Sequence, residues 1–261
     1  MMRALWTSAS GMNAQQKNLD TISNNLANVN TAGFKRVRAE FQDLLYQTLA
    51  TPGSGTSNTT ETPNGLQIGL GSKVVATNRL FDQGSLKNTT RSLDMAITGP
   101  GFFQVTLPDG NTGYTRDGSF TLDANGQIVN NQGYLLTPNI TLPQEAKSVV
   151  IGTDGTVTVD IGEADPQNAG QIQLATFINP SGLKALGGNI YTETNSSGAA
   201  VVAVPGSPGT GEIQANFLES SNVDVAEEMI NLIIGQRAFE VTSRSVRTAD
   251  TVLGEITSLK R

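Results

Sequence analysis

Apolar residues recur at seven-residue intervals at both ends of this 261-residue chain. This spacing returns to the same face of an α-helix every second turn, so each end is predicted to form a long amphipathic helix. The N-terminal repeat comprises Leu5, Met12, Leu19 and Leu26, with Ile22 and Val29 at the second apolar position. The C-terminal repeat comprises Val225, Leu232, Phe239, Val246 and Leu253. Two such helices are expected to pair antiparallel, which brings the chain ends together.

Local signals set the ends of both helices. The first is expected to run for about 25 residues and to stop near Asn28 and Asn30, with Gly33 in the left-handed conformation beyond it. Asp224 and Glu227 have the spacing of a capping pair at the start of the second helix. Because two helices alone leave part of an apolar stripe uncovered, the repeat residues are predicted to form an assembly seam with further copies of the chain.

Between the helices the sequence is typical of β-structure. From Gly71 to Gln214, short apolar strands alternate with turn signals, and Asn125-Gly126 between two such strands predicts a hairpin. The fold class is therefore predicted to be α+β, with a central, mainly β domain. The expected domains are a discontinuous helical domain of residues 1–34 with 222–261, an extended connecting segment of residues 35–70 and a β domain of residues 71–221.

Two parts of the connecting segment differ in character. Residues 51–65, TPGSGTSNTTETPNG, form a polar insertion without periodicity, which is predicted to be extended or disordered in the isolated chain. Residues 37–49 have apolar residues at helical spacing but suit an extended conformation equally well, so both conformations stay open.

The composition excludes several functions. The chain has no Cys and no His, which rules out Ser-His-Asp and Cys-His catalysis and the usual zinc sites. Its net charge of −6 argues against nucleic-acid binding, which requires clustered Lys and Arg. No apolar run reaches the roughly 18 residues of a membrane-spanning helix, and the N-terminus does not resemble a cleaved signal peptide. We expect no membrane insertion, no metal, no cofactor and no catalytic residues.

Three short motifs resemble catalytic, nucleotide-binding or calcium-binding sequences, but each match is weak. Ser181 and Lys184 have Ser-x-x-Lys spacing, but the surrounding sequence is typical of a loop. Gly69 and Gly71 form only part of a nucleotide-binding fingerprint. Asp123 opens the sequence DANG, which resembles a fragment of a calcium loop but lacks the terminal Glu; a hairpin turn there needs no ion. None of the three is predicted to be a site.

Longer stretches resemble one known family. Residues 23–35, SNNLANVNTAGFK, resemble the N-terminal signature of the bacterial flagellar rod and hook proteins. Residues 221–257, SNVDVAEEMINLIIGQRAFEVTSRSVRTADTVLGEIT, resemble the C-terminal helix of that family, and residues 65–105 are most like its distal rod members. The positions that carry the N-terminal signature are Asn24, Asn25, Leu26, Asn28, Thr31, Gly33 and Phe34.

The resemblance implies a structural subunit of the distal rod, which self-assembles into a rigid helical tube and transmits torque from motor to hook. The terminal helices would form an inner coiled-coil layer, and the insertion at residues 51–65 would stiffen the tube. The implied partners are further copies of the chain, proximal rod proteins, hook or hook-adjacent subunits, P- and L-ring proteins, the rod cap and the flagellar export apparatus. The implied location is the basal body, spanning the periplasm, after export without a cleaved signal peptide.

Two other interpretations stay open at this point. One is a proximal-rod or hook paralogue. The other is a secreted β-domain enzyme or carbohydrate-binding module with helical ends. Sugar-binding modules usually display clustered aromatic side chains, whereas the single Trp of this chain, Trp6, lies in the first predicted helix. This disfavours the second interpretation, and concentration-dependent assembly would separate it from the favoured one.

Overall fold

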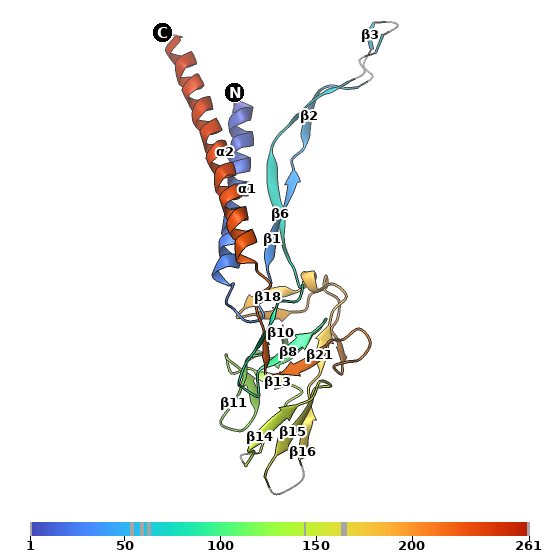
Figure 1. The fold of residues 1–261 in the computed structure, drawn as a ribbon. Coiled ribbons are helices and arrows are strands. Elements are labelled where there is room, and N and C mark those ends of the chain that lie inside the picture. Colours follow the sequence, from blue (N-terminus) through green and yellow to red (C-terminus); the bar gives the residue numbers. More distant parts are fainter. Residues whose placement is uncertain are drawn as a thin grey trace. The chain divides into compact units, whose positions relative to one another are not determined.

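The computed structural model describes residues 2–52, 55–57, 60–61, 64–143, 145–162 and 166–259, and the chain divides into two compact units. The helical unit comprises Met1–Leu26, Val37–Asn78 and Asp224–Arg261; the β unit comprises Ala27–Arg36 and Arg79–Val223. Two terminal helices and a central, mainly β part confirm the predicted α+β class (Figure 1). The division differs from the expected boundaries, because residues 27–36 belong with the β-structure and residues 37–78 group with the helices.

Both terminal helices are present and run antiparallel. α1 (Met2–Ala27) and α2 (Val225–Leu259) lie side by side, and the N- and C-termini lie at the same end of the pair (Figure 1). A Cβ atom added to Gly235 of α2 would come within 2.9 Å of the Leu19 side chain of α1, and one added to Gly11 would lie 3.8 Å from Thr242. The glycines therefore allow the two helices to approach closely, and the order of the contacts gives the antiparallel direction.

The seven-residue repeats lie on the covered faces of the two helices. Ile22 is buried, and the other repeat positions within the helices are half-buried, apart from Val225, which is 41% exposed. Val29 lies beyond the end of α1, in the β unit, and is half-buried there. The repeat positions are thus partly covered within one chain, and the buried Ala14 of α1 is not one of them.

The predicted signals mark the helix ends. Asp224 caps α2: its Oδ1 accepts hydrogen bonds from the backbone N–H groups of Ala226 (2.8 Å) and Glu227 (3.2 Å). After α1 the chain enters a turn at Asn28, and Gly33 has a φ of 67°, in the left-handed region as expected. The polar segment that follows the first helix is thus a turn that leads the chain into the β unit.

The connecting segment is a β-ribbon, the arm (residues 37–78). β1 (Val37–Asp43) pairs with β6 (Ser72–Arg79), β2 (Tyr46–Ala50) with β5 (Leu66–Gly69), and β3 (Gly55–Ser57) with β4 (Thr60–Glu61). Most of residues 37–49, whose conformation the sequence left open, are therefore in strands. The insertion at residues 51–65 contains β3 and β4; its residues 53–54, 58–59 and 62–63 lie outside the described part of the chain.

Asn25 connects α1 to the arm. Its side-chain amide donates a hydrogen bond to the Val37 carbonyl (2.8 Å) and accepts one from the Val37 N–H (2.9 Å). The side chain thus pairs with the first residue of β1 as a neighbouring strand would, and Asn25 is 1% exposed. Gly71, between β5 and β6, packs against α1 so closely that a Cβ atom would overlap the Ser10 side chain.

The β unit is built from short antiparallel strands. Among the described residues, the main sheet has the order β11-β12-β13-β9-β10-β19-β18, and β17 joins β9 to β20. The bounds are β9 (Phe102–Thr106), β10 (Thr112–Thr115), β11 (Phe120–Leu122), β12 (Ile128–Asn130), β13 (Leu135–Thr137), β17 (Leu174–Thr176), β18 (Lys184–Gly187), β19 (Ile190–Thr192) and β20 (Val201–Ala203). A second sheet contains β14 (Ser148–Ile151), β15 (Thr156–Asp160) and β16 (Gln167–Gln171). Two ribbons pair β8 (Met95–Thr98) with β21 (Glu212–Ala215) and β7 (Leu86–Asn88) with β22 (Phe217–Glu219).

Apolar side chains from these sheets fill the core of the β unit. Phe103 and Phe120 are fully buried and meet edge to face, with ring centroids 5.3 Å apart. They pack with side chains from strands of both sheets and of the β8–β21 ribbon, including Met95, Ile97, Val105, Ile128, Leu136, Val157, Val159, Leu174 and Ile213. The hairpin predicted at Asn125-Gly126 is confirmed, since β11 and β12 pair on either side of it.

We predict that Gly33→Ala will destabilise the β unit more than Gly110→Ala. Both glycines have positive φ, which disfavours Ala by roughly 1 kcal/mol. A Cβ atom at Gly33 would also lie 2.6 Å from the backbone nitrogen of Asp117, whereas nothing lies within 4 Å at Gly110. Thermal unfolding followed by near-ultraviolet circular dichroism of the buried tyrosines should show a clearly larger fall in Tm for Gly33→Ala. Equal shifts would mean that this close approach contributes nothing.

Candidate assembly surface

An open groove runs along the helix pair where the predicted seam is incompletely covered. It has a volume of about 640 Å³, and its lining includes Leu5 and Met12 of α1 and Val246 of α2. Polar side chains, including Asn13 and Gln16, complete the lining. The structure therefore brings predicted seam residues from the two helices together at one groove. Their half-burial shows that the second helix covers only part of the stripe.

A second apolar surface lies on the opposite face of α2, where the repeat did not place it. We call Met229, Ile230, Ile233 and Ile234 the outer face of α2; their side chains are 52–61% exposed. The sequence MINLII is apolar at all positions but one, so it supplies both the covered face and this outer face. Of these six residues, only Leu232 is a position of the seven-residue repeat, so the repeat did not predict the outer face.

The arm also exposes large apolar side chains. Leu45 is 86% exposed, and Tyr46, Leu49 and Leu66 are each more than half exposed. All residues of β2 and β5 are exposed, and a two-stranded ribbon with both faces in water is marginally stable at best. The arm is thus a third surface that further packing would stabilise, and its apolar residues were left unassigned by the sequence pattern.

The residues of the family signature build the turn after α1. Asn28 and Thr31 hydrogen-bond to each other through backbone and side-chain atoms, each at 3.1 Å. Phe34 is buried in the β unit, Leu26 is half-buried and Asn24 is exposed. Together with the Asn25 pairing and the left-handed Gly33, these positions shape the path of the chain from α1 into the β unit.

A buried charged cluster in the β unit was not anticipated from the sequence. Lys35 Nζ lies 2.7 Å from Glu219 Oε1, and both side chains are 0% exposed. Arg116 Nη1 lies 3.5 Å from the other carboxylate oxygen, and its side chain is 3% exposed. Burial lowers the pKa of the Lys35 amino group below its ordinary value, and the charge of Glu219 opposes that shift. Lys35 and Glu219 are 184 positions apart, so no local pattern connects them.

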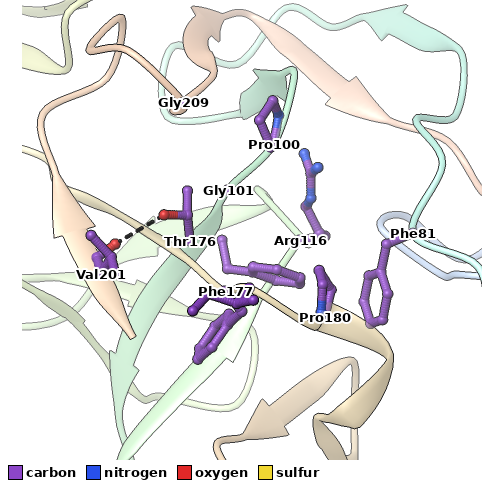
Figure 2. A pocket seen from close by; sticks show the side chains of 11 residues that line it. Phe81, Pro100, Gly101, Arg116, Thr176, Phe177, Pro180, Val201 and Gly209 are labelled. Atoms are coloured by element: carbon purple, nitrogen blue, oxygen red, sulfur yellow. Dashed lines mark hydrogen bonds between the residues drawn. The ribbon is translucent and has the colours of Figure 1, made fainter. Parts of the chain in front are cut away.

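The β unit also contains an aromatic pocket of about 300 Å³ (Figure 2). Phe81, Phe102 and Phe177 line it, and Arg116 is its one charged residue among those described. Thr176 Oγ1 donates a hydrogen bond to the carbonyl of Val201, so its proton is engaged (Figure 2). The lining offers no pair of acidic and basic groups that could transfer a proton to and from a substrate.

The weak motifs form structural turns. Ser181 lies in a single 3₁₀ turn (Pro180–Gly182) and donates a hydrogen bond to the Arg79 carbonyl (3.2 Å), while Lys184 is exposed in β18. The Asp123 carboxylate accepts hydrogen bonds from the N–H groups of Asn125 and Gln127, which closes the predicted hairpin. Within the described ranges, no three acidic, His or Cys residues gather as metal ligands would. Neither of the described helices is long and apolar enough to cross a membrane.

The amino-acid sequence of the chain matches one family of known proteins. The family described as flagella basal body rod protein matches residues 5–35, the flagellar hook protein FlgE/F/G D1 domain matches residues 96–159, and the C-terminal domain of flagellar basal body rod FlgEFG proteins matches residues 214–259. The flagellar basal-body rod protein FlgG of Borreliella burgdorferi is 49% identical, with both chains covered completely. The FlgG proteins of Caulobacter vibrioides (48% identical, 99% of this chain and 100% of the relative) and Bacillus subtilis (42%, both chains covered completely) are also similar. The chain belongs to the family of flagellar basal-body rod proteins, and within it to the FlgG group.

Proposed function

We propose that this chain is a structural subunit of the distal flagellar rod, which assembles with copies of itself into a rigid helical tube and transmits torque from motor to hook. The observation that carries this proposal is the apolar surface that the helical unit leaves uncovered. It comprises the groove between α1 and α2, the outer face of α2 and the exposed side chains of the arm. Membership of the rod family supports copies of the chain as the main occupants of these surfaces.

The geometry suits a contact that repeats along a tube. A tube or filament grows through head-to-tail contacts, in which one surface of a subunit meets a different surface of the next. The groove along α1 offers a concave apolar surface, and the outer face of α2 offers a projecting one. Covering each half-exposed side chain of the outer face contributes roughly 1 kcal/mol. The terminal helices are proposed to pack in this way into an inner coiled-coil layer, with the repeat residues as its seam.

The arm is assigned the role of a bridge between neighbouring subunits. It is a thin ribbon with exposed apolar residues below its polar insertion, and it needs a packing partner to become rigid. Ordering the insertion opposes assembly by about 1 kcal/mol per residue, so hydrogen bonds from its Ser, Thr and Asn side chains to neighbours must offset this entropy. Pinned in this way, the insertion would resist the sliding of subunits that accompanies bending.

The remaining parts of the proposal follow from the family. The further partners are proximal rod proteins, hook or hook-adjacent subunits, the P- and L-ring proteins, the rod cap and the export apparatus. The subunit is proposed to span the periplasm within the basal body and to be exported without a cleaved signal peptide. It is proposed to act without catalysis, and the relatives give no support to the alternative of a secreted enzyme or carbohydrate-binding module.

Ile233→Asp on the outer face of α2 should abolish assembly and leave the fold of the monomer unchanged. Ile233 is 54% exposed, so the carboxylate is hydrated in the monomer, but it would be buried unpaired in a subunit contact, which is unfavourable by several kcal/mol. The matched control is Thr248→Asp, which adds the same charge at an exposed, polar position of α2. Electron microscopy and sedimentation should detect tubes for the control alone. Normal tubes from Ile233→Asp would remove the outer face from the assembly surface.

Leu232→Asp and Phe239→Asp test the covered face. Both residues are half-buried between the helices, so a carboxylate there should loosen the helix pair as well as block assembly. Far-ultraviolet circular dichroism should report a loss of helix in the monomer, while the near-ultraviolet signal of the β unit is retained. Tubes of normal length from either variant would contradict the predicted seam.

Deletion of residues 53–63 should leave β-unit folding and tube formation intact but give tubes that are more curved or flexible. The deleted residues lie within the polar insertion, whose composition cannot form a core. The curvature of isolated tubes is measured by electron microscopy, beside the Tm of the monomer. Straight tubes would contradict a stiffening role, and a large fall in Tm would show that the insertion belongs to the folded core instead.

A further inference from the structure

Two segments from opposite ends of the chain meet inside the β unit. The N-terminal segment (Gly33 to Arg36) and the C-terminal segment (Glu219 to Asn222) are joined by three contacts. The Gly33 N–H donates to the Glu219 carbonyl (2.8 Å), Lys35 Nζ donates to the Glu219 carboxylate (2.7 Å), and the Arg36 N–H donates to the Asn222 side chain (2.7 Å). The two segments are therefore bound directly to each other within the same folded unit.

A third segment, Leu80 to Gly84, binds both of them. The Leu80 N–H donates to the Arg36 carbonyl, and Lys35 Nζ donates to the Asp82 carbonyl. From the C-terminal side, Glu219 Oε1 accepts the Gly84 N–H at 2.9 Å, and the Asn222 side chain donates to the carbonyls of Leu80 and Asp82. The docking of the three segments thus depends on shared atoms, above all on the carboxylate of Glu219.

Charge makes partial docking unfavourable. Lys35, Arg116 and Glu219 are buried, and removing one member of a buried ion pair leaves the other charge without compensation. If the N-terminal segment left, the Glu219 carboxylate would keep the hydrogen bond from the Gly84 N–H, but its nearest cation would be Arg116, which lies 3.5 Å away and donates no hydrogen bond to it. If the C-terminal segment left, Lys35 and Arg116 would remain as buried cations held by backbone carbonyls.

We propose that Lys35, Arg116 and Glu219 form a latch that couples the docking of the two terminal segments, so that release of either segment releases the other. The latch adjoins the apolar clusters, since the guanidinium carbon of Arg116 lies 5.6 Å from the centre of the buried Phe102 ring of β9. It acts within a single subunit and does not depend on the proposed assembly into a tube. Such coupling is reciprocal, because a free energy that links two events affects both equally.

Hydrogen exchange of the full-length protein tests this coupling. The substitution Lys35→Met keeps the length of the side chain and removes its charge. It should raise exchange at the amide of Leu80, and also at the amide of Ser220, which donates to the Ser85 carbonyl on the C-terminal side. We expect increases of about tenfold or more at both amides, as for the loss of one partner from a buried ion pair. Amides of β9 in the core should keep their protection.

The reciprocal variant is Glu219→Gln, which removes the negative charge but keeps a side-chain acceptor. It should raise exchange at the amides of Gly33 and Leu80, and because it preserves shape it remains informative if Lys35→Met fails to fold. The matched control is Lys87→Met on β7, an exposed position that faces Leu218 in the paired strand β22. The control should leave exchange unchanged at all of these amides.

Three outcomes would overturn the proposal. Unchanged exchange in both variants would show that the ion pairs do not hold the segments. Faster exchange on the mutated side alone would show that the two segments dock independently. A uniform increase in hydrogen exchange across the β unit, including β9, would show that the cluster stabilises the whole core and does not specifically couple the two segments.

Discussion

Two helices cannot enclose the apolar surface that their own sequences carry. Each helix of this chain has a covered stripe, but the groove beside α1 stays open and α2 has a second apolar face. Helices in proteins gain most of their stability from packing, so the stability of the helical unit depends on how much of its apolar surface is covered. In this sense one chain leaves the helical unit incompletely covered, and we propose that other rod subunits cover it.

The β unit differs from the helical unit, because its own strands enclose its apolar core. Its sheets enclose a core with Phe103 and Phe120 at 0% exposure, and it also buries the ion pair of Lys35 and Glu219. The two units therefore differ in how much of their apolar surface the chain itself covers.

The sequence predicted the features that repeat over short distances. The helix pair follows from the spacing of residues such as Leu19 and Phe239, the cap from Asp224, and the hairpin from Asn125-Gly126. It did not predict the outer face, because a run such as MINLII fits several faces of a helix at once. It also left the arm undecided, since Phe41 and Leu45 have helical spacing in a segment that tertiary pairing with β5 and β6 makes extended. The Lys35–Glu219 contact joins positions too far apart for any local pattern.

The meeting of both terminal segments at Glu219 has a mechanical consequence. A force on either segment would act on the β unit through the same buried hydrogen bonds and ion pairs. The force would therefore be shared between the two segments. Since these bonds are shielded from water, solvent cannot readily replace them during a brief stretch. Because the proposed latch couples the two segments, weakening either attachment would loosen both, and a rod built from such subunits would depend on each attachment staying intact.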